Sequence, residues 1–213
     1  MTKLDLTKQD KQYYTATVKP HLVEIGEVHY LSITGKGDPS GREFAEKIEA
    51  LYPVAYAIKF DFKSRGRDFV VPKLEGLWWF DEKKFSGLSM TQSPVEVPRS
   101  EWEYRLMIRL PDFVSRIDFE RAVESTLQKK DNRLFHTLEY FTLHEGRCIQ
   151  ILHVGPFSTE PKTLETIRKF SEENDLSRNG LHHEIYLSDF RKTAGEKLKT
   201  ILREPVKESG RDS

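Results

Sequence analysis

The sequence predicts an α+β domain: two strand-rich halves form antiparallel sheet, with a helix of each half packed on one sheet face. Three observations predict this class. Residues 101–110 alternate apolar and polar side chains, which is typical of a half-buried strand. Residues 44–58 repeat apolar side chains every three or four positions, which is typical of a helix with one buried face. The predicted elements also repeat the order strand, helix, strand, strand without matching sequence, so we expect a pseudo-twofold pair of units with a ligand cleft between them.

Bulk composition excludes several classes of protein. A chain of 213 residues is long enough to bury a core. Lys plus Arg and Asp plus Glu number 34 each, so no overall charge favours direct binding to nucleic acid. A single cysteine, Cys148, excludes an internal disulfide framework and suits a reducing cytoplasm. The N-terminus is charged and unlike a signal peptide, and no run is long enough to cross a bilayer. We therefore expect a cytoplasmic protein without a membrane partner.

The first half follows an N-terminal arm of residues 1–27. Residues 28–34 have strand composition, a glycine-rich turn follows, and Ser40 with Glu43 predicts a helix capping box. That helix has one apolar stripe, formed by Phe44, Ile48, Leu51, Ala55 and Ile58, and Tyr56 lies off it. A strand is predicted over 68–80 and a loop over 81–100.

The strand over 101–110 presents an apolar face composed of Trp102, Tyr104, Leu106, Ile108 and Leu110. Ser115 and Asp118 predict the cap of a second helix, whose inward residues are Phe119, Val123 and Leu127.

The second half is predicted from turn signals. Glu145-Gly146 separates strand-like residues 134–144 from 147–154, which indicates a hairpin. Ser158 and Pro161 predict the start of a third helix, with Leu164, Ile167 and Phe170 inward. Asn179-Gly180 predicts a turn, 182–189 and 198–206 predict strands, and residues 207–213 are a charged tail.

The stretch 182–189 carries the candidate chemistry. Because side chains alternate along a strand, His182, Glu184 and Tyr186 share one face, and His183, Ile185 and Leu187 share the other. A half-enclosed Glu184 carboxylate beside a phenol suits a cation or the activation of water. Periodicity alone equally describes an ordinary strand face in solvent.

Tryptophans supply flat surface, and their arrangement leaves two interpretations open. Adjacent Trp78 and Trp79 must face opposite sides of their strand, so one of them covers a sheet edge or forms a wall for a flat hydrophobic ligand.

No cofactor or metal is expected. The glycines of 35–41 lack the spacing of a dinucleotide loop and contain Pro39, so they indicate a turn. His182 and His183 point to opposite faces, and no HExxH or Cys/His pair occurs.

Four segments together resemble one family. Residues 72–79, 145–157, 182–189 and 197–203 are similar to the GyrI-like small-molecule-binding family, and the first of them is similar to its stand-alone bacterial members. Phe157 stands where tyrosine is commoner and Phe190 where proline is commoner. The resemblance implies a domain over 28–206, with halves of about 28–130 and 131–206.

The resemblance also implies function. Members include effector domains of multidrug-responsive regulators, in which an acid matching Glu184 meets cationic aromatic drugs, and others resemble gyrase-inhibitory proteins. Stand-alone members include hydrolases that open the cyclopropane of DNA-alkylating natural products. With 27 residues before the first predicted strand, we expect no winged DNA-binding module and therefore not a regulator.

We accordingly expect a detoxifying hydrolase for an aromatic or cationic hydrophobic small molecule. The resemblance assigns Glu184 as the base that activates water, and Tyr186 and His182 are the expected donors to the substrate oxygen. The expected walls for the planar rings are Tyr56, Trp78, Trp79 and Trp102. The alternative is a protein that binds or sequesters drugs without catalysis, or one that modulates gyrase.

Overall fold

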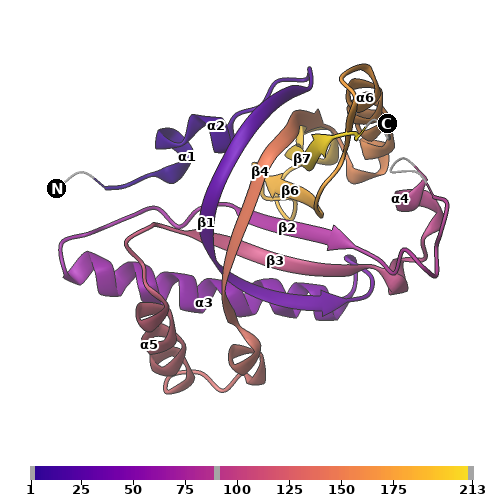
Figure 1. The fold of residues 1–213 in the computed structure, drawn as a ribbon. Coiled ribbons are helices and arrows are strands. Elements are labelled where there is room, and N and C mark those ends of the chain that lie inside the picture. Colours follow the sequence, from indigo (N-terminus) through magenta and orange to yellow (C-terminus); the bar gives the residue numbers. More distant parts are fainter. Residues whose placement is uncertain (1–2, 89–91, 211–213) are drawn as a thin grey trace.

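The computed structural model describes residues 3–88 and 92–210 and contains one antiparallel sheet with helices packed on it (Figure 1). The predicted α+β class is confirmed. The first unit comprises β1 (His21–Lys36), α3 (Arg42–Ser64), β2 (Leu74–Trp79) and β3 (Glu103–Leu110), followed by α5 (Arg116–Leu127). The second unit comprises β4 (Glu139–Val154), α6 (Glu160–Glu173), the short β5 (Leu176–Arg178), β6 (His182–Tyr186) and β7 (Lys199–Glu208). Short helices α1 (Leu6–Gln9) and α2 (Lys11–Tyr14) precede β1, and α4 (Ser93–Glu96) precedes β3.

The sheet joins the two units at two places. Its strand order is β4-β1-β3-β2-β6-β7-β5, and β4 pairs additionally with β7, so the pairings close into a circuit. β2 and β6 meet in antiparallel register with Gly76 opposite Glu184 and Trp78 opposite His182. The order strand–helix–strand–strand therefore occurs twice, as β1-α3-β2-β3 and as β4-α6-β6-β7.

The predicted hairpin at Glu145-Gly146 is wrong, because β4 runs unbroken through it. Gly146 has a φ of 67°, which glycine adopts without steric cost, and pairing with β1 keeps one register on both sides of it. Leu143 and Cys148 pack in the same cluster although an odd spacing should place them on opposite faces. The alternation is thus interrupted at the glycine, and one long strand serves both units.

Several boundaries also differ from those predicted. Residues 134–137, expected in a strand, belong to a 3₁₀ helix over Arg133–Thr137. The Ser40–Glu43 capping box does not form: Gly41 is the N-cap of α3, and the Asp38 carboxylate accepts the Ser40 N–H at 2.8 Å. The Ser115–Asp118 box on α5 is confirmed. β1 begins at His21, so part of the predicted arm belongs to the sheet.

Apolar residues cover both faces of the sheet. α3 buries its predicted stripe against β1, β2 and β3, and α6 buries Leu164 and Ile167 against β4 and β7. On the opposite face, Tyr13 and Tyr14 of α2 pack against a third cluster that includes Ile185. The two long helices α3 and α6 therefore share one face, at opposite ends of the sheet (Figure 1).

Candidate ligand-binding and active site

A cavity of about 800 Å³ lies between the N-terminal parts of α3 and α6, over the junction of β2 and β6. This volume is in the range of pockets that enclose drug-sized ligands. Segment 93–99, which includes α4, contributes a further wall. The cavity is therefore bounded by both units of the fold, as the sequence predicted for the cleft.

Aromatic rings form most of the apolar wall. Trp78 stacks on Phe44 with ring centroids 5.8 Å apart and meets Trp102 edge-on at 6.4 Å. Tyr186 meets Phe190 edge-on at 5.3 Å and Phe157 at 6.0 Å. The two positions at which the chain departs from the commoner family residues thus lie on the cavity wall. Rings at these angles leave flat faces on which a planar ligand can stack.

Four polar residues of the cavity come from β6 and β7: His182, Glu184, Tyr186 and Glu204. His182, Glu184 and Tyr186 all line it, so the predicted shared face of this strand is confirmed. His182 lies between two carboxylates: its Nδ1 contacts Glu204, and its Nε2 is 3.4 Å from Oε1 of Glu184. Burial opposes charge on this imidazole, but the Glu204 carboxylate and the bond with Glu184 outweigh burial and raise the pKa of His182 to about 10. The cavity floor therefore holds an imidazolium between two acids at neutral pH.

Tyr186 is held between Trp78 and Glu184. The Trp78 indole N–H donates to the Tyr186 oxygen at 3.1 Å. Burial first, then the charge of Glu184 and a hydrogen bond with it, raise the pKa of Tyr186 well above its usual value. Gly76 permits this arrangement, since a Cβ there would lie 3.0 Å from both the Trp78 nitrogen and the Tyr186 oxygen. The phenol thus keeps its proton and directs it to Glu184.

Sequence reasoning missed Glu160 and Glu204. Glu160, the first residue of α6, lines the cavity and is 8% exposed. Burial first, and then the charge of Glu184, raise the pKa of Glu160 well above its usual value. In the sequence this glutamate before a proline indicates only a helix start, and Glu204 lies within a strand with no sign of the cavity. Both positions depend on tertiary packing.

Two predicted wall residues lie elsewhere. Tyr56 is 44% exposed on α3, stacked on Phe60 at 6.0 Å, and does not line the cavity. Trp79 packs against the cluster on the opposite sheet face. Trp78 is therefore the member of the tryptophan pair that faces the cavity, together with Trp102. Tyr56 fails as a wall residue because its position off the apolar stripe points it to solvent.

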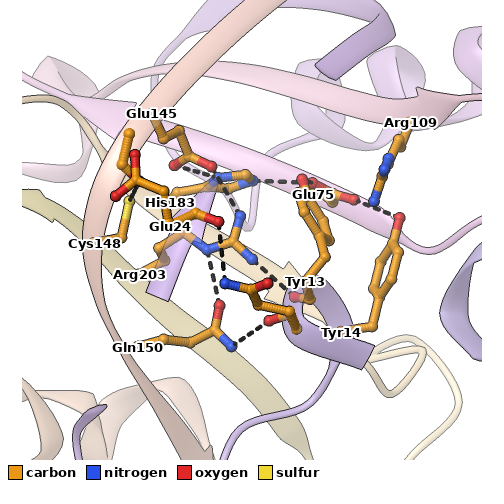
Figure 2. A network of polar contacts seen from close by, with 12 residues as sticks. Tyr13, Tyr14, Glu24, Glu75, Arg109, Glu145, Cys148, Gln150, His183 and Arg203 are labelled. Carbon is orange, nitrogen blue, oxygen red and sulfur yellow. Dashed lines mark hydrogen bonds and ion pairs between the residues drawn. The ribbon is translucent and has the colours of Figure 1, made fainter. Parts of the chain in front are cut away.

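The opposite face of β6 carries a buried polar network (Figure 2). His183, expected on an apolar face, is fully buried, with Nε2 3.0 Å from Glu75 and Nδ1 2.9 Å from Glu145. Arg203 donates to Glu145 at 2.8 Å and to the Tyr13 carbonyl at 2.8 Å. These bonds attach α2 to the sheet face opposite the cavity.

Possible metal ligands and the one cysteine can be placed in the described part of the chain. Residues 3–88 and 92–210 contain no group of three His, Cys, Asp or Glu side chains that is arranged to hold a metal ion. Burial raises the pKa of the Cys148 thiol, so it is an unreactive packing residue. Among the helices of these residues, none has the length and apolarity required to cross a membrane.

A sequence model of the GyrI-like small molecule binding domain matches residues 19–207. The chain belongs to this family. The cavity is accordingly the candidate ligand site of a GyrI-like small-molecule-binding domain.

Solved structures agree with this assignment. An uncharacterized conserved protein from Listeria innocua is 36% identical, with a TM-score of 0.85, over 96% of this chain and all of that one. A protein from Listeria innocua described as a hydrolase is 36% identical, with a TM-score of 0.84, over 97% of this chain and all of that one. The EcmrR C-terminal domain shares the fold at 14% identity, with a TM-score of 0.53, over 89% of this chain and 98% of that one. A comparison with curated proteins gave no match.

Proposed function

We propose that this GyrI-like domain binds flat hydrophobic molecules in its cavity and hydrolyses strained cyclopropane-bearing, DNA-alkylating toxins. The observation that carries the proposal is the Glu184 carboxylate, held by His182 and Tyr186 at the floor of an otherwise aromatic cavity. The relative from Listeria innocua described as a hydrolase, similar over the full chain, supports a hydrolytic activity.

The chemistry requires little of the protein. A cyclopropane conjugated to a dienone is strained and electrophilic. Water attacks a ring carbon, one C–C bond breaks, and its electron pair moves through the conjugated ring to the carbonyl oxygen, which becomes a phenol. The protein must hold the planar rings, remove one proton from the water and supply one to the oxygen.

Glu184 is assigned as the base. It is 9% exposed, so a bound ligand would exclude most of the remaining solvent. The His182 Nε2 lies 3.4 Å from Oε1 of Glu184, and Tyr186 donates a hydrogen bond to the same carboxyl group. Both partners are therefore assigned to positioning Glu184 rather than to the substrate oxygen, and Trp78 and Trp102 would hold the planar rings.

The alternative is binding without catalysis, as a drug-sequestering protein. The same aromatic wall and carboxylate favour it, since neither requires turnover. Incubation with a cyclopropane-bearing alkylator distinguishes the two functions. Product heavier by one water, formed beyond one equivalent per protein, supports the hydrolase, whereas a stoichiometric complex with unchanged ligand supports sequestration.

Glu184→Gln tests the mechanism. Since one positioned base contributes about 10²–10⁴-fold, turnover should fall by roughly that factor while ligand binding persists. Glu196→Gln, at an exposed position on the surface, is the matched control and should match the unsubstituted protein. Equal turnover in the Glu184 variant and this control would remove Glu184 from the mechanism.

A further inference from the structure

We propose that Glu160 is the acid that delivers a proton to the substrate's carbonyl oxygen, so that Glu160 and Glu184 act as an acid–base pair within one cavity. The inference rests on the proposed hydrolysis. It assigns proton donation to the carbonyl oxygen, a step for which His182 and Tyr186 are unavailable. Both ring nitrogens of His182 face carboxylates, and Tyr186 is hydrogen-bonded to Trp78 and Glu184.

Geometry singles out the Glu160 carboxyl group. It lines the cavity, and its Oε1 has no hydrogen-bond partner among residues 3–88 and 92–210. Oε2 of Glu204 has none either, but Glu204 contacts His182 through its other oxygen. An ionised carboxylate that is buried without a donor costs several kcal/mol, whereas the neutral acid avoids most of that cost. The environment of Glu160 therefore favours the neutral acid, which can donate a proton.

The surrounding charges act in the same direction. Burial opposes a negative charge on Glu160, and the charge of Glu184 on β6 opposes it further; Glu204 of β7 lines the same cavity. The His182 imidazolium acts in the other direction but is shared between those two acids. The N-terminus of α6 also favours the anion. Burial and Glu184 outweigh these influences, because the pKa of Glu160 lies well above its usual value.

Two arginines also line the cavity. Arg178 of β5 pairs with Glu82 at 3.0 Å, and Arg99 lies near Asp38, 3.4 Å away. Each arginine pairs with another acid, so neither serves as the counter-ion of Glu160. The two carboxyl groups of the proposed pair thus differ in environment: Glu184 contacts His182 and Tyr186, whereas Glu160 forms no ion pair with any of the described residues. Two carboxyl groups in such different environments can act as a base and an acid in one reaction.

The proton balance of the step is complete. Water forms a C–O bond to the cyclopropane carbon and gives one proton to Glu184. The broken C–C bond delivers its electron pair to the carbonyl oxygen, and Glu160 gives that oxygen its proton. The single product carries a new alcohol and a phenol, and the proton on Glu184 then returns to Glu160 through solvent, so no oxidant or reductant is required.

The pH dependence of turnover tests the assignment. The intact protein should lose kcat/KM as pH rises, along an alkaline limb that reports the loss of the Glu160 proton. Glu160→Gln should lower kcat by about 10²–10⁴-fold and abolish the alkaline limb. Binding of the ring-opened product, followed by tryptophan fluorescence, should stay unchanged. Glu173→Gln, at an exposed position of the same helix, should match the unsubstituted protein.

The outcomes separate the two proposals. Absence of turnover by the intact protein overturns the hydrolase itself. Turnover by the intact protein with an unchanged rate and alkaline limb in Glu160→Gln overturns only the role of Glu160. The role of Glu160 as an acid is also overturned if Glu160→Gln loses affinity for a lipophilic cation but keeps the alkaline limb, because Glu160 would then be a cation ligand. If Glu160→Gln fails to fold, Glu160→Asp serves instead: an alkaline limb that persists but shifts supports the acid, and an unshifted limb overturns it.

Discussion

Replacing Arg203 by methionine removes the cation at the centre of the buried network on the sheet face opposite the cavity (Figure 2). The guanidinium is fully buried and donates to Glu145 at 2.8 Å, to Gln150 at 2.9 Å and to the Tyr13 carbonyl at 2.8 Å. Methionine fills part of the same space but satisfies none of these acceptors. Glu145 would keep only His183 as a charged partner.

The size of the effect follows from this geometry. Removing one partner of a buried ion pair costs about 3–5 kcal/mol, because the remaining charge stays buried. Small domains have about 5–15 kcal/mol of stability in total, so Arg203→Met should lose a large share of it. Urea unfolding followed by circular dichroism measures the free energy of unfolding directly.

Arg147→Met is the matched control. Its side chain is 42% exposed and pairs with Glu208 at 3.4 Å, so we expect less than about 1 kcal/mol of change. If both variants lose similar free energy, the network in Figure 2 does not stabilise the fold in the way argued.

Two further predictions concern the cavity and pH. Trp78→Phe should weaken binding of a planar aromatic ligand about fivefold, which corresponds to about 1 kcal/mol for a lost aromatic contact or hydrogen bond. Trp79→Phe should leave the affinity unchanged. Calorimetric titration compares the two variants, and equal effects would contradict the placement of Trp78 in the cavity. Because the folded pKa of His182 is raised from 6.5 to about 10, its stabilisation is fully present below pH 6.5 and is lost as pH rises through 10. Burial opposes ionisation of Glu145, but the charges of His183 and Arg203 outweigh burial and lower the pKa of Glu145 from 4.5 to about 2. The stabilisation by Glu145 is therefore present above pH 4.5 and is lost as pH falls through 2. Urea unfolding across pH checks both limits, and constant stability from pH 6.5 to 10 would contradict the first.

Local patterns anticipated much of the fold. The apolar stripe of α3 and the Ser115–Asp118 box depend on neighbours in sequence, and both are confirmed. The strand β3 also forms, but it is not half-buried as predicted: Met107 and Arg109 on its second face are buried as well, because the segment that contains α2 packs there. The Glu145-Gly146 signal failed because a glycine with positive φ serves a kink within a strand as readily as a turn. Only the partners β1 and β7, which hold β4 on both sides of the glycine, distinguish the two.

The amino-acid sequence by itself determined the α+β class, the family resemblance and the face shared by His182, Glu184 and Tyr186, since period-two alternation is a local property of a strand. Tertiary structure alone decided that Trp78 rather than Trp79 lines the cavity and that Glu160 and Glu204 join it. The physical reason is that burial and charge pairing arise between residues distant in the chain. A pattern within one element fixes which side chains point together, but not what they meet.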